Sequence, residues 1–93
     1  MKLDIVWTSH FKKDYKLAMK REQNINLLDD IIRLLAKGEP LPETNRDHAL
    51  SGNRIGHREC HIQSDWLLMY HVDNDILVLT LTRTGTHSDL FGK

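Results

Sequence analysis

Four side chains that can transfer protons lie in three separate segments of the chain. His48 lies in RDHAL, His61 and Asp65 lie in HIQSDW, and His87 lies in GTHSDLF near the C-terminus. If the fold brings these segments together, three imidazoles and one carboxylate share one surface. Imidazole suits both proton-transfer roles because its ordinary pKa, about 6.5, lies near neutral pH. The set predicts RNA cleavage without a metal, in which a base activates the ribose 2′-OH and an acid protonates the leaving 5′-oxygen.

Three further residues favour RNA as the substrate. Arg83 lies just before His87, and its forked guanidinium can hold a phosphate through two hydrogen bonds. Trp66 and Phe91 offer flat rings on which an RNA base can stack. The cation would stabilise the charge that builds on the phosphoryl oxygens during cleavage.

Two other interpretations of the histidines stay open from the residues alone. For any one of His48, His61 and His87, a structural role is about as frequent as a catalytic one. The other interpretation is a metal site. His57 and His61 have the spacing His-x-x-x-His, but in a strand four residues span roughly 13 Å, too far for one ion. His48, His61, Asp65 and His87 would still bind a metal if all four converged.

Length and composition limit the class of protein. The chain has 93 residues, which predicts a single domain over residues 1–93. The formal net charge is zero, which argues against strong non-specific binding to nucleic acid. The single cysteine, Cys60, excludes an intramolecular disulfide, and no segment is apolar enough for a signal peptide or a membrane span. We therefore expect a cytoplasmic protein without membrane contact.

The N-terminal half predicts a strand followed by two helices. Alternating apolar residues indicate a strand over residues 3–7, after which Thr8 or Ser9 can cap a helix. A second helix follows, with Asn26 as its expected N-cap and Gly38 just after its end. One face of the first helix carries basic side chains that are candidate contacts to RNA or the ribosome: Lys12, Lys13, Lys16 and Lys20.

The C-terminal half predicts a loop and three strands. The loop runs over residues 38–56, and the strands cover residues 57–62, 66–72 and 76–84. Alternation places His57, Glu59 and His61 on one sheet face, opposite Arg58, Cys60 and Ile62. The order of elements indicates an α+β fold with a mainly antiparallel sheet and helices on one face. The other face would stay open to solvent or a ligand.

The motifs resemble those of a known family. The segment DHALSGNRIGHRECHIQSDWLLMYHV, followed by LTLTRTGTHSDLF, resembles the YafQ branch of the RelE-like toxins of type II toxin–antitoxin systems. The segment FKKDYKLAMKR is similar to the first helix of that family. The likeness covers nearly the whole chain, and its three motifs are specific as a set. It implies a RelE-like fold of the kind read above.

The resemblance also implies a function and partners. Such toxins are ribosome-dependent endonucleases that cut mRNA in the ribosomal A site, without metal or cofactor. Carried over by position, the catalytic residues are His48, His61, Asp65 and His87, and the substrate-binding residues are Arg83, Trp66 and Phe91. The implied partners are mRNA, the ribosome and a cognate antitoxin of the DinJ or RelB type. The toxin would bind operator DNA only as part of its complex with the antitoxin.

The division of catalytic roles is an expectation of its own. We expect His87 to act as the general acid and Asp65 or His61 as the general base, while the remaining histidine acts with Arg83 on the phosphate. The alternative function is a non-catalytic RelE-like module that serves only as an antitoxin partner or operon co-repressor. In that case the histidines would be incidental.

Overall fold

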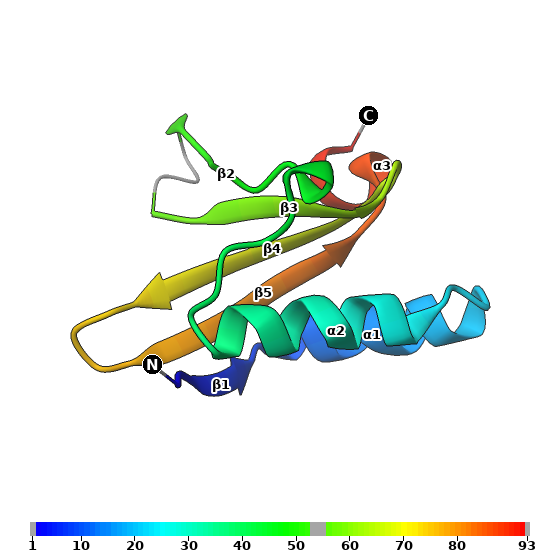
Figure 1. Cartoon of the computed structure of the whole chain (residues 1–93). Helices are drawn as coiled ribbons and strands as arrows, with labels where there is room; N and C mark the ends of the chain where they lie inside the picture. Colours follow the sequence, from blue (N-terminus) through cyan, green and yellow to red (C-terminus); the bar gives the residue numbers. More distant parts are fainter. Residues whose placement is uncertain (1, 53–55, 93) are drawn as a thin grey trace.

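The computed structural model describes residues 2–52 and 56–92, which form a five-stranded sheet with helices on it. Figure 1 shows the arrangement. The strands lie in the order β1-β5-β4-β3-β2, with β1 parallel to β5 and every other pair antiparallel. The elements are β1 (Asp4–Trp7), α1 (Ser9–Lys20), α2 (Ile25–Ala36), the 3₁₀ turn η1 (Glu43–Asn45), β2 (His48–Ala49), β3 (Arg58–Gln63), β4 (Trp66–Asp73), β5 (Val78–Gly85) and α3 (His87–Phe91). The predicted α+β class and the order of the main elements are confirmed.

The two long helices cover one face of the sheet and form the main core with it (Figure 1). Thr8 caps α1, because its hydroxyl accepts a hydrogen bond from the Phe11 backbone. The N-cap of α2 is Asn24 and not Asn26, since the Asn24 side chain accepts from the backbone of Asn26. Tyr15 of α1 donates to Asp29 of α2 at 2.9 Å, so the helices are joined side by side.

The core on the helix side takes alternate residues of the sheet. Its buried members from the strands are Cys60, Ile62, Trp66, Leu68, Tyr70, Leu79 and Leu81. Because side chains alternate across a strand, Leu67 and Met69 point to the opposite face, yet they are only 0% and 2% exposed. Leu90 of α3 is also buried and lies outside the main core. The expectation of an open second face is therefore wrong at its centre.

Three short elements were not expected from the sequence. The predicted loop over residues 38–56 contains η1 and the two-residue strand β2, which pairs with β3. Residues 53–55 of that loop lie outside the described residues. The segment after β5, expected as a tight loop, folds into the short helix α3.

A capping box starts α3 directly after β5. The Thr86 hydroxyl accepts a hydrogen bond from the Asp89 backbone, and the Asp89 carboxylate accepts one from the Thr86 backbone. Arg21, at the end of α1, binds the same carboxylate at 2.7 Å. A Cβ on Gly85 would lie 2.9 Å from the Asp89 Cβ, so only glycine permits this close approach. The turn into α3 therefore depends on Gly85 and Asp89.

The carboxylate of Asp89 should make stability pH-dependent. The Arg21 guanidinium and the Thr86 backbone lower the pKa of Asp89 to about 2, against about 3.9 in the unfolded chain. A lowered folded-state pKa stabilises the protein above pH 4, and this contribution is lost as the pH falls through 2. We expect Asp89→Asn to lower the free energy of unfolding by about 1–2 kcal/mol at pH 7. In urea titrations the difference from the parent should disappear near pH 2.

The control for this prediction is Asp30→Asn, which breaks an exposed ion pair with Arg33 on α2. An exposed pair of this kind contributes little to stability. An equal loss in both variants, or a loss in Asp89→Asn that persists at pH 2, would contradict the role of Asp89.

Candidate active site

His87 and Asp65 form a hydrogen-bonded pair where α3 meets the β3–β4 turn. Asp65 lies in the two-residue turn between Gln63 and Trp66. Its Oδ1 accepts from the His87 backbone N–H at 3.1 Å and from the His87 ring Nδ1 at 2.7 Å. These bonds hold the pKa of the Asp65 carboxyl below its usual value. Because Nδ1 is occupied, the free ring nitrogen of His87 is Nε2.

The His61 ring lies beside His87 on the same surface. The two ring centroids are 5.9 Å apart, and the rings meet edge to face. His61 extends from β3, where its carbonyl accepts a 2.7 Å hydrogen bond from the Asn45 side chain. Phe91, one helical turn after His87, has its ring centroid 6.4 Å from the His87 ring. Thus two imidazoles, a carboxylate and an aromatic ring meet as the sequence predicted.

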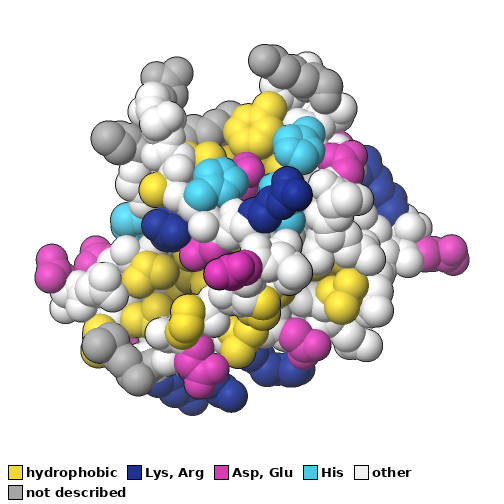
Figure 2. All heavy atoms as spheres, turned by 45° about the horizontal axis from the view of Figure 1, so that its top comes forward, with side chains coloured by type: hydrophobic (Ala, Val, Ile, Leu, Met, Phe, Trp, Pro, Cys, Tyr) yellow, Lys and Arg dark blue, Asp and Glu magenta, His cyan; other side chains and the backbone are white. Residues whose placement is uncertain are grey.

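His48 joins the same sheet face through the pairing of β2 with β3. It lies opposite Glu59, which is two residues before His61 and therefore on the same face. The His48 Nδ1–H donates to the Arg46 carbonyl at 2.7 Å, and Nε2 lies 3.5 Å from Glu59 Oε1. His48 is therefore held on β2 at the edge of the sheet, on the face that carries His61. Figure 2 shows histidine side chains gathered with basic, acidic and hydrophobic side chains on one face of the molecule.

Glu59 is a candidate site residue to which sequence reasoning assigned no role. Alternation placed it on the histidine face, but nothing in the pattern showed that it would be buried. Its exposed fraction is 5%, and among the described residues its Oε2 has no hydrogen-bond partner. A buried carboxylate is costly unless it is paired. Its position next to His48 therefore makes it a candidate partner for that imidazole.

Trp66 does not serve as a stacking surface, so that expectation is wrong. Its side chain is 1% exposed in the main core, and its indole N–H donates to the Thr84 hydroxyl at 3.0 Å. Trp66 begins β4 on the face that α1 and α2 cover, so both faces of its ring are packed against protein.

Arg83 is bound by a carboxylate of the protein itself. Its Nε and Nη2 donate to the two oxygens of Asp14 on α1, at 2.8 and 3.1 Å. Asp14 also accepts from the Thr84 backbone, so the pair ties α1 to the end of β5. A phosphate would have to compete with Asp14 for this guanidinium, and phosphate binding by Arg83 stays a prediction. The side chains of Lys12, Lys13, Lys16 and Lys20 are exposed on α1, where contact with RNA also stays a prediction.

The proposed metal site is not formed in the described part of the chain. Over residues 2–52 and 56–92, no three or more His, Cys, Asp or Glu side chains are grouped so that they could hold a metal ion. His57, whose spacing from His61 suggested a pair, has its ring beside His71 instead, with centroids 5.7 Å apart. Within the same residues, none of the helices has the length and apolar character needed to cross a membrane.

Comparison with known proteins gives a consistent result. The family described as "Bacterial toxin of type II toxin-antitoxin system, YafQ" matches residues 3–92. The chain is 40% identical over 90 residues to the mRNA interferase toxin YafQ of Escherichia coli strain K12, with 96% of each protein covered. It is similar to the crystal structure of YafQ from E. coli BL21(DE3), with a TM-score of 0.91, 38% identity, and 98% of this chain and 100% of that chain covered. It also matches the crystal structure of the E. coli DinJ-YafQ toxin-antitoxin complex, with a TM-score of 0.90, 39% identity, and coverage of 99% and 100%. The resemblance predicted from the sequence is confirmed, and the prediction of an endoribonuclease agrees with the name of the E. coli relative.

The pair of His87 and Asp65 predicts one tautomer. In its neutral form, the His87 ring should carry its proton on Nδ1, because the Asp65 carboxylate can only accept a hydrogen bond. Nitrogen-15 NMR of labelled imidazoles at alkaline pH measures this directly. The Asp65→Ala variant should lose the preference for Nδ1, while His10 on α1 should give the same spectrum in both proteins. A neutral His87 protonated mainly at Nε2 in the parent would contradict the geometry.

Proposed function

Because the chain belongs to the YafQ family of bacterial toxins from type II toxin–antitoxin systems, we propose that it is a ribosome-dependent endoribonuclease. In this proposal it cuts mRNA in the ribosomal A site and so stops translation. One observation carries the proposal. The His61 and His87 ring centroids lie 5.9 Å apart where α3 meets the β3–β4 turn, and Asp65 of that turn is hydrogen-bonded to His87. Two proton-transfer groups at this spacing can contact a single phosphodiester.

The reaction needs one base and one acid. His61 removes the proton from the ribose 2′-OH, whose oxygen attacks the adjacent phosphorus. The bond from phosphorus to the 5′-oxygen breaks, and His87 gives a proton to that oxygen through Nε2. The products are a 2′,3′-cyclic phosphate and a 5′-hydroxyl. Each well-placed acid or base contributes a factor on the order of 10²–10⁴ to the rate.

Asp65 has a positioning role in this scheme. Its Oδ1 already accepts two hydrogen bonds from His87, so it fixes the ring and stabilises the imidazolium that donates the proton. Because Asp65 already accepts hydrogen bonds from His87, His61 is the better of the two candidate bases. His48 lies next to Glu59 at the edge of the site and assists in binding the phosphate.

Substrate binding would use the groups around the two rings. Phe91, beside His87, offers a ring on which a base can stack, and stacking of this kind is worth about 1–3 kcal/mol per base. Arg83 becomes a phosphate ligand if the incoming phosphate displaces Asp14. The exposed lysines of α1 would contact the ribosome or mRNA. All steps use side chains of this chain alone, without metal or cofactor.

The partner of the free toxin would be a cognate antitoxin of the DinJ or RelB type. The E. coli relative, to which this chain is 39% identical, has been crystallised as the DinJ-YafQ toxin-antitoxin complex. We propose that this chain forms the same kind of complex and reaches operator DNA only through its antitoxin.

Replacing the proposed acid tests the function. His87→Ala should reduce cleavage of ribosome-bound mRNA by a factor on the order of 10²–10⁴ and abolish growth arrest. Binding to the antitoxin and the thermal unfolding temperature should stay close to those of the parent, because the ring is about half exposed. Mapping of message ends after induction gives the cleavage directly.

The matched control is His10→Ala, which removes an exposed histidine from α1. It should arrest growth as the parent does. If His87→Ala at equal expression also arrests growth, the assignment of His87 is wrong. If the parent binds its antitoxin but neither cleaves message nor slows growth, the chain is the non-catalytic binding module instead.

A further inference from the structure

The proposed reaction builds negative charge on a phosphate, yet most arginines of the protein already have a carboxylate partner. Among the residues that the structure describes, four arginines are in ion pairs: Arg21, Arg33, Arg58 and Arg83. Arg46 is the remaining one, and its side chain is exposed. Its guanidinium can therefore bind a phosphate without breaking an ion pair of the protein.

The backbone around Arg46 is fixed on both sides. The preceding residue, Asn45, donates from its side chain to the His61 carbonyl at 2.7 Å. The following residue, Asp47, accepts a hydrogen bond from the Tyr70 hydroxyl and is paired with Arg58 at 3.2 Å. Arg46 lies between these anchors and at the end of η1, so its position relative to β3 is set before any ligand binds.

Arg46 also adopts a left-handed backbone conformation, with φ 49° and ψ 45°. This conformation is uncommon for residues other than glycine and asparagine. It turns the chain from η1 into β2, and the Arg46 carbonyl then accepts the hydrogen bond from His48 Nδ1. One residue thus orients a site histidine through its backbone and carries a cation on its side chain.

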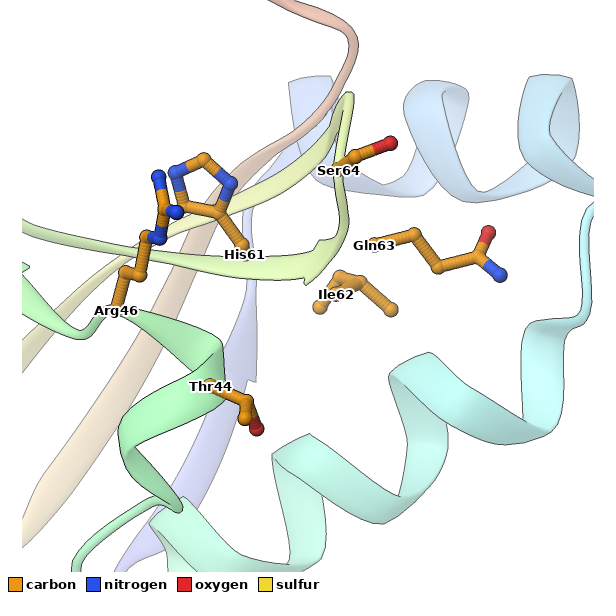
Figure 3. Close-up of a pocket in the computed structure, with 6 residues that line it drawn as sticks. All are labelled: Thr44, Arg46, His61, Ile62, Gln63 and Ser64. Atoms are coloured by element: carbon orange, nitrogen blue, oxygen red, sulfur yellow. The ribbon is translucent and has the colours of Figure 1, made fainter.

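The side chain of Arg46 lines a pocket next to His61. Figure 3 shows the Arg46 and His61 side chains together at one end of the pocket, with Thr44 below them and Ile62, Gln63 and Ser64 to the right. The pocket has a volume of about 310 Å³ and is lined by Thr44, Arg46, His61, Ile62, Gln63 and Ser64. Hydroxyl and amide groups surround one apolar side chain there. This mixture suits a sugar and base whose phosphate is bound by the cation.

We propose that this pocket is an RNA subsite in which Arg46 binds the phosphate next to His61. The guanidinium neutralises the non-bridging oxygens of the phosphodiester, while Thr44, Gln63 and Ser64 contact the attached nucleotide. The inference rests on the proposed function, since it names the group that holds the RNA at that same site. It assigns the main phosphate contact to Arg46, while Arg83 contributes only where a phosphate displaces Asp14.

Salt dependence of binding tests the phosphate contact without any chemistry. The probe is a single-stranded RNA oligonucleotide with 2′-O-methyl groups, which cannot be cleaved. Each phosphate contact to a single strand contributes about 0.7 to the slope of log affinity against log salt concentration. In NMR titrations we expect Arg46→Asn to lower that slope by about 0.7 relative to the parent. Asparagine tolerates the left-handed backbone, so the thermal unfolding temperature should not fall.

Two controls define the outcome. Arg33→Gln removes an equal charge from α2, where the side chain is exposed, paired with Asp30 and not part of the pocket lining, and should leave the slope unchanged. Arg46→Lys keeps the charge and should retain most of the slope. Equal slopes for the parent and Arg46→Asn would overturn the inference, as would a loss of slope in Arg83→Gln alone.

Single-turnover cleavage separates this inference from the proposed function. If the parent cleaves ribosome-bound mRNA, Arg46→Asn should be slower by a factor of ten or more. A parent that cleaves together with a fully active Arg46→Asn variant contradicts only the role of Arg46. A parent that does not cleave contradicts the proposed function, while the slope measured with the oligonucleotide still decides whether Arg46 binds phosphate.

Discussion

The carboxylate of Asp89 determines where the helix that carries His87 begins. It accepts a hydrogen bond from the Thr86 backbone and forms an ion pair with Arg21. A side chain at position 85 would clash with Asp89. The strand β5 therefore turns directly into α3. The first residue of α3 then meets Asp65 of the β3–β4 turn through both its backbone and its ring. His87 is thus fixed by local hydrogen bonds on one side and by a neighbouring hairpin on the other.

The second half of the site depends on how a long irregular segment is attached to the sheet. The Asp47 carboxylate accepts a hydrogen bond from the Tyr70 hydroxyl and forms an ion pair with the Arg58 guanidinium. Tyr70 is 1% exposed and belongs to the core. Burial and the nearby carboxylate raise the pKa of Tyr70 above its usual value, so the hydroxyl keeps its proton and donates at any physiological pH. The core on the helix side thereby positions His48 and Arg46 on the other face. Removing the Tyr70 hydroxyl or the Arg58 guanidinium would therefore disturb the positions of His48 and Arg46, although neither group contacts RNA in this proposal.

Much of the site was predictable because its residues stand at the ends of strongly patterned elements. Asp65 directly precedes β4 and His87 follows β5, and the apolar runs of these two strands are clear in the sequence. His61 lies near the end of β3, so the convergence of the three residues followed from an antiparallel sheet. The short elements were missed for a physical reason. A strand of two residues, His48–Ala49, has no periodicity, and α3, with five residues, is held by its cap and by Arg21 from 68 positions away. The burial of Trp66 and the ion pair between Arg83 and Asp14 likewise depend on contacts that the local sequence does not encode.

The most direct test of the account uses an RNA in which the 5′-oxygen at the cleaved bond is replaced by sulfur. A thiolate leaves without protonation, so a variant that lacks only the general acid should recover its rate on this substrate. His87→Ala should cleave the sulfur substrate within about tenfold of the parent, although it should be slower than the parent on ordinary RNA by a factor on the order of 10²–10⁴. His61→Ala should stay slow on both substrates. Equal impairment of His87→Ala on both substrates, or recovery of His61→Ala in its place, would contradict the assignment of His87 as the acid.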